Sequence, residues 1–169
     1  MEISYTPIGY FNTPHTDVRG MPIQPPGASG VHGSITVLPE FREGLRDIDG
    51  FSYLIVLYHL HEICGYDLTV TPFLDKNPHG IFATRSPKRP NPVGLSVLRL
   101  LDVQGDTLML DNVDVLDGTP VIDIKPYVPD FDVWPARRVG WFEGKSGNAS
   151  TVKSDDRFVG LEAECAREK

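Results

Sequence analysis

The chain has 169 residues, the size of one ordinary domain, and 40% of them are hydrophobic. Its 16 Lys and Arg against 23 Asp and Glu give a formal net charge of −7, which excludes a nucleic-acid binder that relies on bulk positive charge. The 16 Gly and 15 Pro predict many turns and short elements, and they disfavour a bundle of long helices.

The first third of the chain alternates short extended segments with loops. Residues 3–11 form an extended segment, and residues 12–34 form a Pro- and Gly-rich loop of a length that is often functional. Residues 31–38 alternate apolar and polar side chains, as in a half-buried strand, and residues 39–45 fit one helical turn. Residues 51–60 are β-branched and aromatic, which predicts a central strand buried on both faces.

Three further strands are predicted in the second half. Residues 95–103 and 108–116 are strands joined by a turn at residues 104–106. In residues 121–128 apolar side chains alternate with charged ones, so the charged side chains face outward. Short strands at close spacing, separated by turn signals, predict a mainly β fold: a β-barrel with short helices.

The last part of the chain has no clear period. We expect a β-barrel domain at residues 1–133 and a C-terminal extension at residues 134–169. Residues 144–154 have the composition of a flexible linker, and apolar residues between 158 and 165 stand at helical spacing. The extension is therefore expected to be partly flexible, with a short helix at its end.

Membrane insertion and export are not predicted. The longest uncharged apolar run, residues 53–60, is far shorter than the ~20 residues of a membrane-spanning helix. No basic segment followed by an apolar one stands at the start, so no signal peptide is indicated. Cys64 and Cys165 suggest no disulfide framework, so we expect reduced thiols in a cytoplasmic protein.

A first candidate site is the pair His59 and His61. Residues two apart on a strand share a face, so both imidazoles can point at one metal ion, with Cys64 and His79 as further ligands. A pattern this short is more often one buried histidine and one that lines a cleft. We therefore expect no metal ion, and a metal-dependent barrel enzyme is the least favoured alternative.

A second candidate site is the basic loop at residues 83–96. Arg85, Lys88 and Arg89 lie there among three prolines. Because proline fixes φ, the charges are held without a large ordering cost when a ligand binds. A carboxylate or a phosphate is the natural partner, and a solvated basic turn is the plainer alternative.

A third candidate site runs from Asp114 to Tyr127. Asp114 and Asp117 flank a tight turn, and Asp123 and Lys125 share one face of the strand that follows. Such carboxylates can accept hydrogen bonds from ribose hydroxyls or an ammonium group, or can take a proton. A hairpin turn capped by aspartates is the alternative interpretation.

These segments carry two specific motifs, one at residues 82–96 and one at residues 117–120 followed by residues 123–127. Together with residues 61–62, they make the chain similar to the TsaA-like family over roughly residues 3–132. The characterised members of that family are the TrmO tRNA methyltransferases.

The resemblance implies a β-barrel that binds S-adenosyl-L-methionine without a Rossmann sheet, and a homodimer with the cofactor near the subunit interface. It also implies N6-methylation of threonylcarbamoyl-adenosine beside the anticodon, with the tRNA anticodon loop as partner. The family's cofactor-binding motifs match these residues of the chain: Pro22, Ile23, Gln24, His61, Glu62, Arg85, Leu95, Asp114, Val115, Leu116, Asp117, Gly118 and Thr119.

The remaining site residues concern the methyl acceptor. Transfer to an amide-like nitrogen needs a proton acceptor, and Asp123, Lys125 and Tyr127 are the candidate catalytic residues on the acceptor side. Lys88 and Arg89 are the candidate RNA-binding residues. Two alternatives stay open besides the metal enzyme: the same barrel acting on a small molecule or another RNA, and a non-catalytic module that binds the cofactor.

Overall fold

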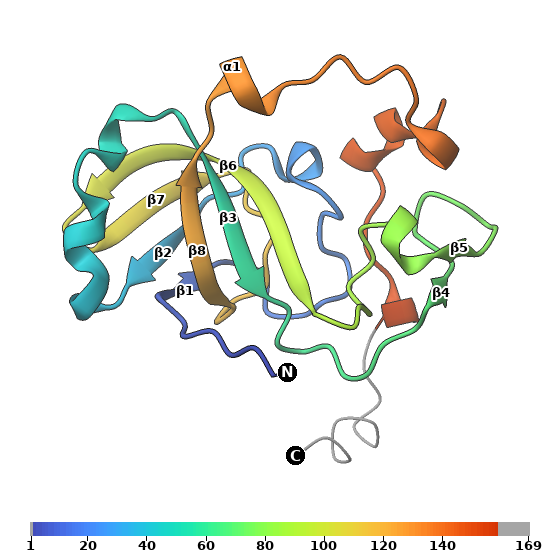
Figure 1. The fold of residues 1–169 in the computed structure, drawn as a ribbon, viewed down its shortest axis with the longest axis horizontal. Helices are drawn as coiled ribbons and strands as arrows, with labels where there is room; N and C mark the ends of the chain where they lie inside the picture. Colours follow the sequence, from blue (N-terminus) through green and yellow to red (C-terminus); the bar gives the residue numbers. More distant parts are fainter. Residues whose placement is uncertain (1, 159–169) are drawn as a thin grey trace.

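The computed structural model describes residues 2–158, and its centre is a closed antiparallel barrel of six strands (Figure 1). The strands follow the order β1-β2-β7-β6-β3-β8, and β1 pairs with β8 to close the barrel. This confirms the predicted mainly β barrel. The barrel strands are β1 (Gly9–Asn12), β2 (Gly33–Val37), β3 (Tyr53–His59), β6 (Val93–Gln104), β7 (Thr107–Asp111) and β8 (Pro120–Pro126).

The other elements are short. Two short strands, β4 (Thr69–Val70) and β5 (His79–Gly80), pair as a two-stranded sheet outside the barrel. The remaining elements are one α-helix and seven 3-10 helices in the described residues: α1 (Pro129–Asp132), η1 (Pro25–Ala28), η2 (Pro39–Leu45), η3 (Ile48–Gly50), η4 (Ile81–Ala83), η5 (Gly140–Phe142), η6 (Ser146–Ser150) and η7 (Asp156–Phe158). None of the helices among residues 2–158 is long and apolar enough to cross a membrane.

Strand β3 shows how the barrel separates its two faces. Leu54, Val56 and Tyr58 point into the barrel and are buried, whereas the residues between them are half-buried or exposed. The expectation that this strand is buried on both faces is therefore wrong. In a barrel only every second side chain of a strand points into the interior, so the other face of β3 lies on the outside of the barrel.

Strand β8 has an irregularity that its sequence pattern did not predict. Val121 pairs with Tyr58 and Asp123 with Leu57, so Ile122 is an extra residue in β8. This β-bulge allows both Val121 and Ile124 to pack against the core, although they are three positions apart and regular alternation would place them on opposite faces. The charged residues of β8 face outward, as predicted.

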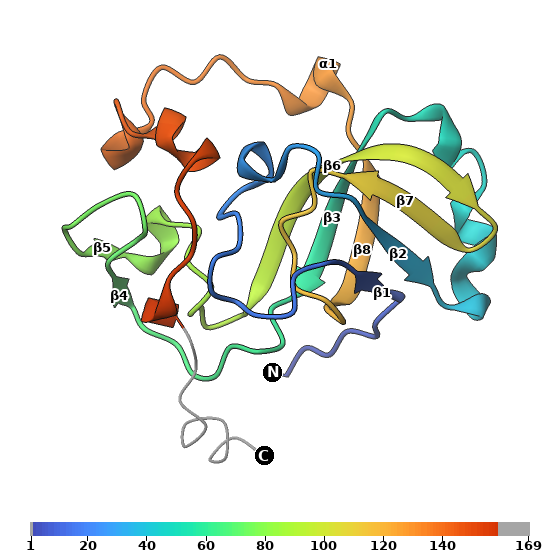
Figure 2. The same cartoon turned by 180° about the vertical axis from the view of Figure 1, so that it is seen from behind.

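A second lobe lies beside the barrel, built from the β4–β5 region and the C-terminal extension (Figures 1 and 2). Val70, Ile81 and Phe158 form its small apolar core, with Phe73 packed against them. Residues 144–154, expected to be a flexible linker, instead contain η6 and hydrogen-bond to other parts of the chain. The predicted boundary after residue 133 stays a prediction.

Cys64 corrects another expectation. It is disulfide-bonded, which contradicts the prediction of reduced thiols. The number and spacing of cysteines in a sequence do not fix their redox state, so the expectation had no structural basis. The helix expected between residues 158 and 165 lies almost wholly outside the described residues.

Gly94 provides a test of the barrel packing. A Cβ built at this position would lie 2.2 Å from the ring of the buried Tyr58, which leaves no room for a methyl group. We expect Gly94→Ala to lower the free energy of unfolding by about 1–3 kcal/mol, because the ring must move. Denaturant unfolding measures this. Gly44→Ala is the matched control, since its Cβ would meet nothing within 4 Å, and equal stability of the two variants would contradict the packing argument.

Candidate functional site

An open pocket lies where the mouth of the barrel meets the second lobe. Its cavity volume is about 140 Å3, and it is partly open to solvent. Its walls come from the β1–β2 connection (residues 13–32), the β3–β6 connection (residues 60–92), the β7–β8 turn (residues 112–119) and the extension. The lining residues are Val18, Met21, Tyr58, Leu60, His61, Glu62, Ile63, Phe73, Pro87, Asp114, Val115, Leu116, Thr119, Ser154, Asp155 and Phe158.

A chain of hydrogen bonds runs from the barrel interior to this pocket. The Ser96 hydroxyl donates to Asp114 Oδ1 at 2.7 Å, and its oxygen lies 3.0 Å from the Tyr58 hydroxyl. Burial raises the pKa of Asp114 to about 6, while the Ser96 hydrogen bond and the positive charge of Arg85 act in the opposite direction. Burial, followed by the charge of Asp114, also raises the pKa of Tyr58. The pocket thus contains a carboxyl group that is costly to ionise.

The basic loop reaches the β1–β2 connection through one contact. Arg85 Nη1 donates to Gln24 Oε1 at 2.6 Å, which joins two of the predicted cofactor motifs. Arg89 turns back on its own loop, where Nη1 donates to the carbonyl oxygens of Thr84 and Ser86 at 2.9 and 3.3 Å. Through these hydrogen bonds from Nη1, Arg89 stabilises the loop. Its role in RNA binding stays a prediction, as does that of Lys88.

The structure brings part of the predicted cofactor set together and leaves part of it apart. The predicted residues that line the pocket are His61, Glu62, Asp114, Val115, Leu116 and Thr119. Asp117 instead accepts a hydrogen bond from the Thr13 amide at 2.8 Å, and Gly118 has the positive φ of 72° that the turn requires. Leu95 is 47% exposed and faces away from the barrel interior.

The three candidate catalytic residues also face outward. Asp123 and Lys125 lie opposite Leu57 and Ile55 of β3 and form an ion pair of 2.5 Å. Tyr127 packs edge to face against Tyr53, with ring centroids 6.3 Å apart. None of the three lines the pocket. Their catalytic role therefore stays a prediction.

The two histidines of the metal alternative have other environments. Partial burial and the neighbouring His61 lower the pKa of His59. His61 lies at the pocket, with Nδ1 3.4 Å from the Thr119 hydroxyl and Nε2 3.5 Å from a Glu62 carboxylate oxygen. Among residues 2–158 no group of three His, Cys, Asp or Glu side chains is arranged to hold a metal ion.

Sequence reasoning missed several residues that line or support the pocket. Tyr58 and Ser96 read as ordinary strand residues, although the alternation of β6 could have placed Ser96 inside the barrel. Ser154, Asp155 and Phe158 come from the extension, and no local pattern indicates that it returns to the barrel.

Comparison with known proteins shows which family the chain is similar to. Residues 10–133 match the family model of the tRNA-methyltransferase O N-terminal domain. A probable S-adenosyl-L-methionine-binding protein of Pyrococcus abyssi is 45% identical over 159 residues, which cover 94% of this chain and 86% of that protein. The tRNA (adenine(37)-N6)-methyltransferase of Escherichia coli is 36% identical over 132 residues, 72% of this chain and 56% of that protein.

A solved structure shares the fold. The crystal structure of TrmO from Pseudomonas aeruginosa superimposes with a TM-score of 0.70 at 36% identity, covering 83% of this chain and 63% of that one. The chain therefore spans less than two thirds of the length of these two bacterial relatives.

The buried carboxyl of Asp114 predicts a pH-dependent stability. Between about pH 4 and 6 the folded chain keeps a proton that the unfolded chain, with an ordinary Asp pKa of 3.8, has released. This group's contribution therefore falls as pH rises through that window, by about 3 kcal/mol in all. Asp114→Asn keeps the acceptor for Ser96, so we expect a variant as stable as the wild type at pH 4 and more stable at pH 7.

Denaturant midpoints of both proteins from pH 4 to 7 measure this difference. Asp117→Asn, at the more exposed carboxylate of the same turn, is the control and should show no such gain. An Asp114→Asn variant that is less stable than the wild type at pH 7 would contradict the assignment.

Proposed function

The chain belongs to the family of the tRNA-methyltransferase O N-terminal domain, and from this membership we propose that it is a cytoplasmic methyltransferase. It binds S-adenosyl-L-methionine in the pocket and methylates N6 of threonylcarbamoyl-adenosine beside the tRNA anticodon. The observation that carries this proposal is that residues of two of the family's motifs, at 61–62 and 114–119, line one pocket, with His61, Asp114 and Thr119 on its wall.

The charge of the pocket fits a cationic ligand. Asp114 is held by Ser96 in a largely desolvated position, and burial raises its pKa. A sulfonium or ammonium group beside this carboxylate would offset the desolvation cost of ionising it. The cofactor carries both groups, so the fit rests on the chemistry of the pocket as well as on the motif.

Other pocket residues suit the rest of the cofactor. The exposed guanidinium of Arg85 is available to a carboxylate, and Gln24 fixes one of its nitrogens. Met21, Phe73 and Phe158 give the pocket an apolar wall that excludes water. S-adenosyl-L-methionine supplies an electrophilic methyl group when bound. The chain's own residues bind it, orient it and keep water away.

The outward-facing residues support a homodimer. Leu95 belongs to the family's cofactor motif but lies on the outer face of β6, together with the exposed Val93. Asp123 and Lys125 lie on the same outer face, on β8. A second copy packed on this face would cover the apolar side chains and bring these groups toward its own pocket, which is the arrangement that the family resemblance implies.

A labelling experiment distinguishes this proposal from two alternatives, a methyltransferase with another acceptor and a non-catalytic cofactor-binding module. A barrel that methylates a small molecule or another RNA would turn over the cofactor without this tRNA. A non-catalytic module would bind the cofactor and turn nothing over. Incubation with methyl-labelled cofactor and total tRNA separates them, since only the proposed enzyme transfers label to threonylcarbamoyl-adenosine.

Cofactor binding should depend on pH through Asp114. If the ionised carboxylate holds the cation, affinity falls as pH drops through about 6, since protonation removes the partner charge. We expect the Kd of S-adenosyl-L-methionine to rise about tenfold from pH 7 to pH 5. Calorimetry measures this, with Asp114→Asn as the variant whose Kd should no longer change. A wild-type Kd that is constant over this range would contradict the pairing.

S-adenosylhomocysteine locates the pairing within the cofactor, because it keeps the ammonium group and lacks the sulfonium charge. A Kd of this product that changes little with pH indicates that Asp114 faces the sulfonium. An equal pH dependence of both ligands indicates that it faces the ammonium group.

Binding of tRNA by an acidic chain requires a local basic surface. We expect the exposed Arg137 and Arg138 to add to the cations of the basic loop, and few phosphate contacts predict a log–log salt slope of about −2 to −4 for an anticodon stem-loop. The Arg137→Ala, Arg138→Ala double variant should reduce that slope by about 1–2. Filter binding measures it, and Arg46→Ala, at an arginine paired with Glu43, is the control.

The same assay with stem-loops that carry or lack the threonylcarbamoyl group tests the substrate. The modified form should bind more tightly. If neither form binds at low salt, the proposal that tRNA is the methyl acceptor is wrong, and the result favours a small-molecule acceptor.

A further inference from the structure

The part of the extension at residues 139–158 crosses two connections that carry proposed cofactor residues. In both ribbon views it lies against the β4–β5 region and beside the β1–β2 connection (Figures 1 and 2). We call residues 139–158 the brace segment. Its contacts with each connection are specific hydrogen bonds, and they converge close to Pro22–Gln24 and Arg85.

Ser154 fixes the β1–β2 connection. Its carbonyl oxygen accepts from the Gly20 amide at 2.8 Å, and its amide donates to the Met21 carbonyl at 2.9 Å. Its hydroxyl accepts from the Met21 amide at 2.9 Å and donates to the Val18 carbonyl at 2.6 Å. The next residue in this connection, Pro22, forms a β-bridge with Lys153. One serine therefore fixes the backbone directly before the proposed Pro22–Gln24 motif.

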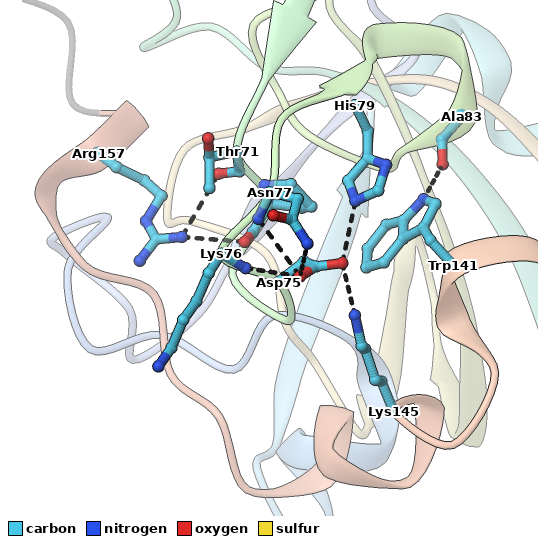
Figure 3. A network of polar contacts seen from close by, with 10 residues as sticks. Thr71, Asp75, Lys76, Asn77, His79, Ala83, Trp141, Lys145 and Arg157 are labelled. Atoms are coloured by element: carbon cyan, nitrogen blue, oxygen red, sulfur yellow. Dashed lines mark hydrogen bonds and ion pairs between the residues drawn. The ribbon is translucent and has the colours of Figure 1, made fainter.

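Trp141 and Lys145 fix the β3–β6 connection (Figure 3). Trp141 Nε1 donates to the Ala83 carbonyl at 2.7 Å, two residues before Arg85, and the indole stacks on His79 with centroids 4.6 Å apart. Lys145 Nζ contacts Asp75 Oδ2 at 2.5 Å, and the same oxygen lies 3.0 Å from His79 Nε2. The hydrogen bonds from Lys145 and His79 hold the pKa of Asp75 well below its usual range.

The two connections meet at the Arg85–Gln24 hydrogen bond, and the brace segment binds the backbone on each side of that contact. We propose that the brace segment holds both connections in the geometry that binds the cofactor, with Ser154 and Trp141 as positioning residues. The proposal rests on the proposed cofactor site.

The physical reason lies in the length of these connections. Each has little regular structure of its own, so without outside contacts it samples several conformations. The apparent Kd of a ligand rises by the inverse of the fraction of molecules in the competent conformation. Coupling is reciprocal, so a ligand that bridges the two connections also tightens the brace segment.

The decisive variant is Ser154→Ala, which removes one hydroxyl and leaves the Met21 amide without its acceptor. We expect the Kd of S-adenosylhomocysteine, measured by calorimetry at pH 7, to rise about five- to tenfold. Ser150→Ala is the matched control, because the Ser150 hydroxyl donates to Gly147 within the brace segment itself; its Kd should equal that of the wild type. Ser154→Thr keeps the hydroxyl and should restore most of the affinity.

Trp141→Phe tests the second contact independently. It keeps an aromatic ring over His79 and removes the donor to Ala83, so the Kd should again rise several-fold with little loss of stability. If Ser154→Ala and Trp141→Phe both bind as the wild type does, the proposal is wrong.

Hydrogen–deuterium exchange gives a readout that needs no ligand. In Ser154→Ala the Met21 amide should exchange about tenfold faster, and in Ser150→Ala it should not. In the wild type, added S-adenosylhomocysteine should slow exchange in the brace segment. A wild-type protein that binds no ligand would refute the proposed function, whereas ligand binding with unchanged exchange in the brace segment would refute only the present inference.

Discussion

The pocket depends on a hydrogen-bonded chain that begins inside the barrel. Gly94 has no side chain, so the ring of Tyr58 can lie over its backbone, and the Tyr58 hydroxyl reaches Ser96. Ser96, almost fully buried, then holds the carboxyl of Asp114 at the barrel mouth. Hydrogen bonding and burial act on the same carboxyl in opposite directions, and burial is the larger effect. The barrel therefore holds an acidic group at its mouth whose ionised form the surroundings stabilise only in part.

Sequence periodicity predicted most of the barrel strands because their signal is local, but it extended β7 to residue 116, whereas the strand ends at Asp111 and a turn follows. The alternation that defines β2 and β8 reports which side chains a barrel can bury, and the turn at Gly105 separates β6 from β7 as expected. The bulge at Ile122 was not predictable, because it depends on the register with β3 rather than on β8 alone. Burial on both faces of β3 was wrongly predicted for the same reason: composition does not indicate what covers the outer face.

The sequence predicted the candidate site only where its residues are neighbours in the sequence. The stretch from Asp114 to Thr119 forms one wall because a tight turn keeps its residues together. Ser154 reaches Met21 across 133 residues of sequence, and no composition or spacing indicates such a contact. The flexible-linker expectation failed there because Gly and Ser were read as flexible, whereas a small hydroxyl is what satisfies backbone groups in a confined space.

The barrel separates two kinds of chemistry by strand alternation. Ser96 points inward and donates a hydrogen bond to Asp114, whereas its neighbour Leu95 points outward and is exposed in the monomer. The outer face also carries the Asp123–Lys125 pair, whose opposite charges lower the local field available to a polyanion. An RNA backbone would therefore be attracted less to this face than to exposed arginines such as Arg137 and Arg138. Selectivity for the acceptor would then depend on contacts with the base itself, because a chain of net charge −7 provides no long-range electrostatic attraction for RNA as a whole.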